Sequence, residues 1–190
     1  VIGLDIAGID ILATDISRPL EEQGAIVVEV NASPGLRMHL QPSAGVSRPV
    51  GEAIMSTLFP EGETGRIPIV AVTGVNGKTT TVRFISHILK QSGKLVGMTC
   101  TDGIYIGERR IDNEDCSGPA SAQAVLMNPS VEAAVLETAR GGILRAGLGF
   151  DLCDVAVVTN IGEGDHLGLS DVDTAESLAK VKRTIVEVVS

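Results

Sequence analysis

The sequence is most informative at Val70-Ala-Val-Thr-Gly74-Val-Asn-Gly77-Lys78-Thr79-Thr80-Thr81. The apolar residues before Gly74 predict a buried strand, and the residues after Gly77 predict a helix that begins with Lys-Thr. The backbone N–H groups of such a glycine turn, together with the helix N-terminus, bind the oxygens of di- and triphosphates. In this motif Lys78 would reach the β- and γ-phosphates, and the Thr79 hydroxyl would bind Mg²⁺. We therefore expect a site for ATP and Mg²⁺. The full Walker pattern has Gly at the position of Val72, so the match is to a shortened form.

Strands alternate with helices on both sides of this turn, and near-continuous apolar strands of this kind predict a parallel sheet covered on both faces. A small hairpin is expected within Ile104–Ile111. The expected strands are Ile67–Thr73, Lys94–Thr99, Ala133–Leu136 and Val155–Thr159, and the expected helices are Lys78–Ser92, Ala120–Met127 and Thr174–Val189.

The N-terminal part has a different pattern. Apolar segments at Val1–Ala13 and Gly24–Val30 flank a polar turn, which predicts a β-hairpin at the edge of an antiparallel sheet. A helix is expected to begin with Ser47 as its N-cap residue and to run to Phe59. The polar segment Pro60–Arg66 is the best linker candidate. We therefore divide the chain into residues 1–59, a linker at 60–66 and a second domain at 67–190.

Glu29 and Asn31 lie two residues apart on the second predicted strand of the hairpin, so their side chains project from one face. Their oxygens suit one Mg²⁺ ion, and Asp10 on the preceding strand could approach them across the hairpin. The hairpin is therefore a second candidate metal site. The alternative is a strand that ends in a polar turn.

Composition excludes several classes of protein. The chain has 24 Asp and Glu against 15 Lys and Arg, a net charge of −9 and 2% aromatic residues, which argues against nucleic acid or an anionic membrane as partner. No apolar run approaches the ~20 residues of a membrane span, and no secretory signal opens the chain. Its 3 cysteines lack CxxC spacing, so neither a disulfide framework nor a zinc site is expected. These features favour the cytoplasm. The chain begins with Val and ends in helical sequence, so we expect an internal fragment of a longer protein.

The segments TGVNGKTTT at 73–81, LETAR at 136–140 and TNIGEGDHL at 159–167 together resemble the Mur ligases, ATP-dependent enzymes that form amide bonds. The resemblance implies an acyl phosphate intermediate, with Lys78 and Mg²⁺ neutralising the phosphate charge. It implies that Glu137 and His166 serve metal ions and that Lys182 is the catalytic lysine, often carbamylated in relatives. The residues that it places around the nucleotide are Gly74, Asn76, Gly77, Lys78, Thr79, Thr80 and Asn160.

The hairpin resembles the C-terminal end of ATP-grasp enzymes, in which Asp, Glu and Asn hold magnesium ions that bridge the ATP phosphates. Carried over, these ligands are Asp10, Glu29 and Asn31. The resemblances imply an α/β fold class, in which the end of an ATP-grasp α+β domain precedes a truncated P-loop, Mur ligase-like domain with a mostly parallel sheet flanked by helices.

An ATP-grasp end followed by a Mur-type loop resembles the cyanophycin synthetase family, which joins both in one chain. That resemblance implies that one site extends a polyaspartate backbone by aspartate and the other attaches arginine to its side-chain carboxylates. The implied partners are ATP, aspartate, arginine and the growing primer, in an enzyme expected to be a homo-oligomer. We expect no synthetic activity from the isolated fragment.

Two alternatives remain open at this point. Another Mur-type ligase would add a different amino acid, such as glutamate, and arginine-dependent ADP release would separate it. A P-loop switch or partitioning ATPase would hydrolyse ATP without amino acids and would not need Glu29-Val-Asn31. Arg140-Gly-Gly142 could suggest an RNA-binding RGG box, but it is single and the chain is acidic, which favours a packed turn.

Overall fold

A computed structural model describes residues 4–162 and 172–190 of the chain. The chain forms two compact units that divide between Gly65 and Arg66, and each unit is described by itself. His166, one of the expected metal ligands, lies outside the described residues.

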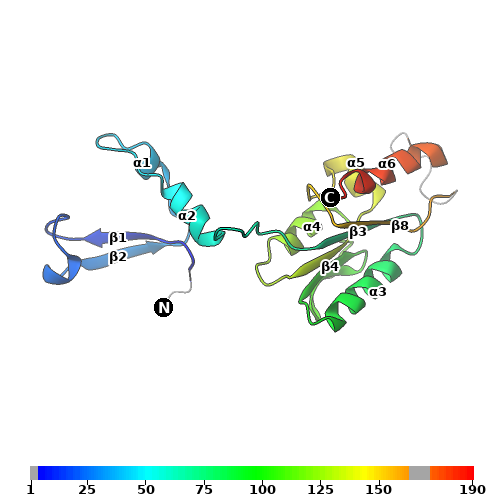
Figure 1. Cartoon of the computed structure of the whole chain (residues 1–190), viewed down its shortest axis with the longest axis horizontal. Helices are drawn as coiled ribbons and strands as arrows, with labels where there is room; N and C mark the ends of the chain where they lie inside the picture. The colour runs from blue at the N-terminus through cyan, green and yellow to red at the C-terminus, as the bar shows by residue number, and fades with distance from the viewer. Residues whose placement is uncertain (1–3, 163–171) are drawn as a thin grey trace. The chain divides into compact units, whose positions relative to one another are not determined.

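The first unit contains the expected hairpin. Strand β1 (Gly8–Leu12) pairs antiparallel with β2 (Ile26–Asn31), and two helices follow (Figure 1). The remaining elements of this unit are a 3₁₀ turn (Leu20–Glu22), α1 (Arg37–Leu40) and α2 (Val50–Leu58). The expectation that Ser47 caps α2 is wrong. Pro49 is the N-cap residue, and the Ser47 hydroxyl instead donates to the Leu40 carbonyl at 2.7 Å.

The register of the hairpin places Asp10 directly opposite Glu29. Directly opposed residues of an antiparallel pair project from the same face, so this face carries Asp10, Glu29 and, two residues on, Asn31. Both strands are largely exposed, and no residue in either strand is buried. The hairpin thus aligns the three polar residues along one face without enclosing them.

The second unit is built on a six-stranded sheet with the order β6-β5-β4-β7-β3-β8. The strands β4, β7, β3 and β8 run parallel, and β5 and β6 form an antiparallel edge. The strands are β3 (Ile69–Thr73), β4 (Val96–Cys100), β5 (Gly103–Ile106), β6 (Arg109–Asp112), β7 (Ala133–Glu137) and β8 (Val155–Val158). The helices are α3 (Lys78–Gln91), α4 (Pro119–Leu126), α5 (Arg140–Ala146) and α6 (Ala175–Glu187).

Side chains alternate across this sheet into two cores. Val72 and Val135 face α3 and pack with Val82, whereas Ala71 and Leu136 face the opposite side and pack with residues of α4 and α6. Figure 1 shows α3 on one side of the sheet and α4, α5 and α6 on the other. The expected parallel sheet with helices on both faces is confirmed.

The strand order explains why the phosphate loop lies where ligands bind in sheets of this kind. The chain leaves β3, crosses by α3 to β4, and later returns to place β7 between them and β8 on the far side of β3. In open sheets of this kind ligands bind beyond the carboxyl ends of the strands where the strand order reverses. The loop at 74–77 follows the carboxyl end of β3, at this reversal.

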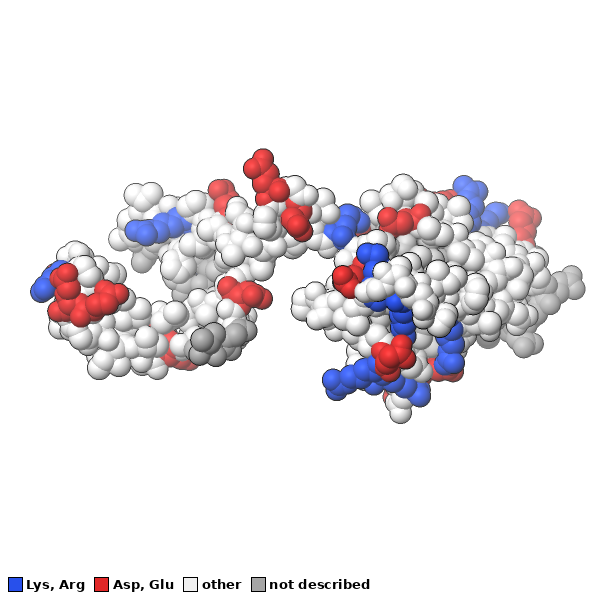
Figure 2. All heavy atoms as spheres, turned by 60° about the horizontal axis from the view of Figure 1, so that its bottom comes forward, with Lys and Arg blue, Asp and Glu red and all other residues white. Residues whose placement is uncertain are grey.

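On the face of the second unit visible in Figure 2, several Lys and Arg side chains lie together, with Asp and Glu side chains among them. Within residues 4–162 and 172–190, every helix is too short or too polar to cross a membrane.

Candidate active site

The phosphate loop depends on two glycines. Gly74 has φ of 150°, and a Cβ built on it would lie 1.9 Å from the Thr159 hydroxyl oxygen. Gly77 has φ of 82° and is the N-cap residue of α3, where a left-handed backbone favours glycine. A side chain is therefore excluded at Gly74 by close approach and disfavoured at Gly77 by backbone conformation.

Residues at the end of β8 hold this loop. The Asn160 side-chain oxygen accepts from the backbone N–H of Val75 (3.1 Å) and Asn76 (3.0 Å), and its Nδ2 donates to the Asn76 carbonyl at 3.0 Å. The Thr159 hydroxyl donates to the same carbonyl at 2.6 Å. The Asn160 amide thus supports the loop backbone, whereas the resemblance placed Asn160 directly at the nucleotide.

Glu137 ends β7 beside the start of α3. Its Oε2 accepts from the Thr79 hydroxyl at 2.9 Å, and its Oε1 lies 3.9 Å from the Lys78 ammonium nitrogen. The side chain of Glu137 is fully buried. Three groups expected to act on phosphate and metal, from segments 58 residues apart, therefore meet at one point.

The arrangement fits a Mg²⁺ ion. Oε1 of Glu137 is buried and has no hydrogen-bond partner among the described residues, although a buried carboxylate oxygen is normally bonded. Mg²⁺ prefers oxygen ligands and is commonly held by one or two carboxylates together with substrate phosphates. Glu137 and the Thr79 hydroxyl would supply such oxygens. No group of three His, Cys, Asp or Glu that could hold a metal occurs in the described part of the chain, so the ion would depend on phosphate oxygens as well.

Lys182 on α6 reaches the same loop from the other side. It is 1% exposed, and its ammonium donates to the Gly74 carbonyl at 2.8 Å. Burial, and after it the positive charges of Lys78 and Arg140, lower the pKa of Lys182 to about 8. Among the described residues of α6, Lys182 is the only buried cation. Lys180 and Arg183 are exposed, and each forms an i,i+4 ion pair with a glutamate of the same helix.

The structure thus brings Lys78, Thr79, Glu137 and Lys182 together around the phosphate loop. Asn76 and Thr80 are exposed on the loop and the first turn of α3. Thr101 was not among the expected site residues, yet its hydroxyl lies 3.1 Å from that of Thr79 and its N–H donates to Glu137 at 3.4 Å. Its place two residues after the expected strand at residues 94–99 was the available signal.

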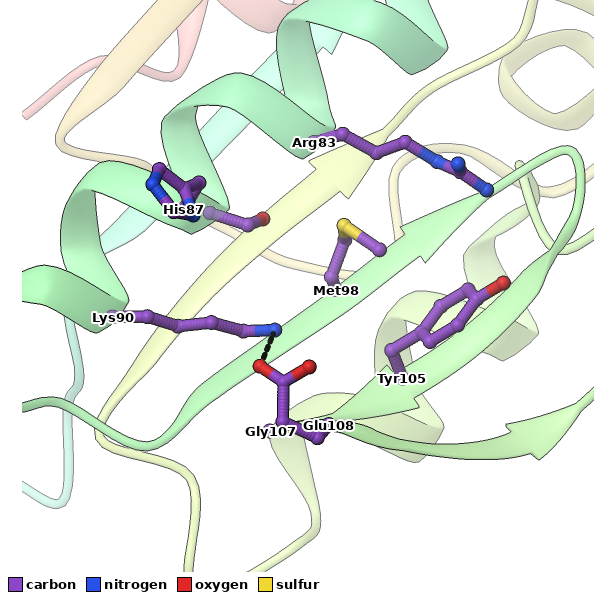
Figure 3. Close-up of a pocket in the computed structure, with 8 residues that line it drawn as sticks. Arg83, His87, Lys90, Met98, Tyr105, Gly107 and Glu108 are labelled. Carbon is purple, nitrogen blue, oxygen red and sulfur yellow. Dashed lines mark hydrogen bonds and ion pairs between the residues drawn. The ribbon is translucent and has the colours of Figure 1, made fainter.

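A separate pocket of about 300 Å³ lies between α3 and the β4–β5 edge (Figure 3). Its cations are already paired, because Lys90 contacts Glu108 at 2.8 Å and Arg83 contacts Asp102. None of its lining residues belongs to the phosphate loop. This pocket is therefore separate from the phosphate loop, where the nucleotide is expected.

Comparison with known proteins identifies the family to which the second unit is similar. Residues 72–190, which include the loop, Glu137 and Lys182, match the Mur ligase middle domain. The chain belongs to the Mur ligase family. A solved structure of UDP-N-acetylmuramoyl-L-alanyl-D-glutamate–2,6-diaminopimelate ligase, a Mur ligase, superposes with a TM-score of 0.56 at 22% identity, over 72% of this chain and 27% of that one. That likeness establishes the fold.

More similar relatives extend the match over both units. The chain is 60% identical over 189 residues to a cyanophycin synthetase of Synechocystis sp., covering 100% of this chain and 22% of that protein. It is 57% identical over 187 residues to a cyanophycin synthetase of Trichormus variabilis, covering 98% and 21%. The chain therefore spans about a fifth of the length of these Mur ligase relatives.

Proposed function

We propose that the chain is part of an ATP-dependent ligase that makes multi-L-arginyl-poly-L-aspartate, with the second unit serving arginine addition. The observation that carries this proposal is the meeting of Lys78, Thr79 and Glu137 at a glycine loop, with Lys182 on the same loop. The similarity to cyanophycin synthetases over both units supports the choice of substrates.

In the proposed reaction, an aspartate side-chain carboxylate attacks the γ-phosphorus of ATP, and the bond to the β-phosphate oxygen breaks to release ADP. The α-amine of arginine then attacks the acyl carbon, phosphate leaves, and the amine loses a proton. Lys78 and Lys182 would stabilise the negative charge that gathers around the transferred phosphoryl group. Mg²⁺, held by Thr79 and Glu137, would supply further positive charge at the phosphates.

The first unit would serve aspartate addition. Asp10, Glu29 and Asn31 share one face of the hairpin, which suits oxygen ligation of magnesium ions bridging phosphates. This assignment and a metal role for His166 remain predictions.

The test uses a chimera in which these 190 residues replace the matching segment of the Synechocystis relative. Aspartate and arginine incorporation into an aspartate-backbone primer is measured separately, together with ADP release. Lys78→Ala is expected to abolish arginine addition and Glu29→Ala aspartate addition, because each removes a charge proposed to act on phosphate or metal. The matched controls are Lys94→Ala and Glu52→Ala, at exposed positions of the same units.

The outcomes separate the alternatives. If the chimera releases ADP equally fast without either amino acid, the ligase proposal fails and a switch ATPase is favoured. If the chimera incorporates glutamate and not arginine into the primer, the proposed reaction class stands and the proposed amino-acid substrate is wrong.

A further inference from the structure

Arg140 is a charged residue that the proposed reaction does not use. It is the first residue of α5, three positions after Glu137, and is 8% exposed. Its Nη1 atom is buried and has no hydrogen-bond partner in the part of the chain that the structure describes. A guanidinium does not lose its charge in proteins, and an unpaired buried donor is unfavourable. Arg140 therefore lacks an acceptor for a buried, charged donor.

Glycines let the helix that begins with Arg140 pack closely on its neighbour. A Cβ at Gly142 would lie 3.1 Å from the Cα of Gly118 and 3.2 Å from Pro119, so glycine lets α5 approach the segment before α4. The segments are joined by a hydrogen bond from the Ala139 N–H to the Ser117 carbonyl at 3.0 Å. The Arg-Gly-Gly segment thus opens a helix packed on its neighbour, where the sequence had favoured a packed turn.

Arg140 lines a pocket of about 300 Å³ between these segments. We call it the Arg140 pocket; its lining includes Asp115, Ser117, Gly118, Arg140, Gly142 and Arg145. Asp115 is the acidic member, and its Oδ1 accepts from the N–H (3.1 Å) and hydroxyl (2.7 Å) of Ser117. Within residues 4–162 and 172–190, no ion pair joins Asp115 to Arg140 or Arg145. Two guanidinium groups against one carboxylate leave the pocket with an excess of positive charge.

The segment that carries Arg140 is bonded to the end of β3, just before the phosphate loop. Thr138 lies two residues before Arg140. Its hydroxyl donates to the Val72 carbonyl at 3.1 Å, and its backbone carbonyl accepts from the Thr73 hydroxyl at 2.7 Å. The charge of Arg140 also contributes to lowering the pKa of Lys182, whose ammonium bonds the loop. An anion held by Arg140 would therefore lie near the phosphates proposed to bind the loop.

We propose that the Arg140 pocket binds a carboxylate of the acceptor chain, with Arg140 as the anchoring residue and Arg145 at the exposed rim. The inference rests on the proposed function, since it names the place where the acidic acceptor meets the nucleotide site. A guanidinium matches a carboxylate through paired N–H···O bonds, so a carboxylate of the acceptor would bond the donors with which Arg140 lines the pocket. The ligand class is an acidic, aspartate-rich peptide chain.

The test measures binding of an end-blocked tetra-aspartate peptide, with tetra-asparagine as control, to the 190-residue chain by titration calorimetry. Binding of a fluorescent ADP is measured in parallel. We expect Arg140→Gln to weaken peptide binding about 10-fold or more, with the nucleotide affinity unchanged. Arg140→Lys, which keeps the charge, should restore part of the loss. Arg145→Gln should have a smaller effect, and Arg109→Gln, at an exposed position on β6, none.

Unchanged peptide affinity in Arg140→Gln overturns the inference. A wild-type chain that binds the nucleotide but not the tetra-aspartate peptide also overturns it and leaves the proposed function intact, whereas failure to bind either ligand contradicts both. If Arg140→Gln does not fold, the guanidinium NMR signals of Arg140 in the wild-type chain replace the variant. Peptide-induced shifts confined to Arg140 and Arg145 support the inference, and unshifted signals overturn it.

Discussion

The two units of the chain present their candidate metal ligands in different settings. In the first unit, Asp10 and Glu29 oppose each other on a largely exposed two-stranded sheet. In the second, Thr79 and Glu137 are hydrogen-bonded to each other at the end of a buried strand. A two-stranded hairpin alone is at best marginally stable in water, whereas a sheet with two cores fixes the ends of its strands. Within this chain, the candidate ligands of the second unit are supported by a core, and those of the first unit lie on exposed strands.

Matched leucines test the difference in core support most strongly. Leu136 on β7 is 0% exposed and Leu12 on β1 is 66% exposed. Leu136→Ala should lower the free energy of unfolding by about 2–5 kcal/mol, since it leaves a cavity between the sheet and its helices. Leu12→Ala should change it by about 0.5 kcal/mol or less. Urea unfolding followed by circular dichroism measures both, and equal losses would contradict the contrast between the units.

Matched glutamates test the two candidate metal sites. Glu137→Gln should weaken the Mg²⁺-dependent binding of ATP to the 190-residue chain by about 10- to 100-fold, because a neutral amide replaces the buried carboxylate beside Thr79. Glu29→Gln should leave the binding at the phosphate loop unchanged, since the second unit contains the whole loop and Glu29 belongs to the separate candidate site of the first unit. Titration with a fluorescent ATP analogue, with and without Mg²⁺, provides the measurement. An equal loss in Glu29→Gln would mean that the loop site depends on the first unit.

Most of the fold could be predicted because local patterns determine it. The buried strands Ile69–Thr73 and Ala133–Glu137 lie within two residues of the expected ones, since both are continuous apolar runs. The N-terminus of α2 could not be predicted so well. Ser47 has a side chain suited to capping, but its hydroxyl bonds the Leu40 carbonyl, a contact set by the path of the preceding loop.

Site residues that belong to a local sequence motif could be predicted. A residue whose burial depends on packing between segments far apart in the chain could not. Lys78 and Thr79 follow from the glycine turn and Glu137 from the order of the resembling segments. The hydrogen bond of Thr79 and the ion pair of Lys78, both with Glu137, agree with one site. The burial of Arg140 was missed because its segment packs on Ser117 and Gly118, more than 20 residues away in the chain. No local pattern encodes such an approach.

Matched asparagines test whether loop support is confined to the second unit. Asn160→Ala removes the side chain that bonds the backbone N–H groups of Val75 and Asn76, so the loop loses preorganisation. We expect nucleotide affinity to fall about 10-fold, whereas Asn31→Ala should have no effect on it. Competition with a fluorescent ADP measures both. If Asn160→Ala leaves the nucleotide affinity unchanged, the loop does not need the hydrogen bonds of the Asn160 side chain.

The smallest expected effect is a pH dependence of the free energy of unfolding. It comes from the buried ammonium of Lys182 in the second unit. Its pKa is about 8 in the folded chain, below the ordinary value of 10.5, because burial and the charges of Lys78 and Arg140 disfavour the ammonium form. Between these two values the unfolded chain binds more protons at this residue than the folded chain does, so stability rises with pH there. Below about pH 8 both states are protonated and the full penalty of the buried charge remains.

Relative to Lys182→Met, which removes the titrating group, the wild-type chain should therefore gain about 1 kcal/mol between pH 7 and pH 9. Urea unfolding of both chains at pH 7, 8 and 9 gives this difference, and Lys94→Met, at an exposed position, serves as the control without a pH-dependent change. A difference that stays flat or falls with pH would mean that Lys182 is solvated in the folded chain. The ammonium would then not be held in the buried position from which it bonds the Gly74 carbonyl, and its proposed action on the phosphates would lose its structural basis.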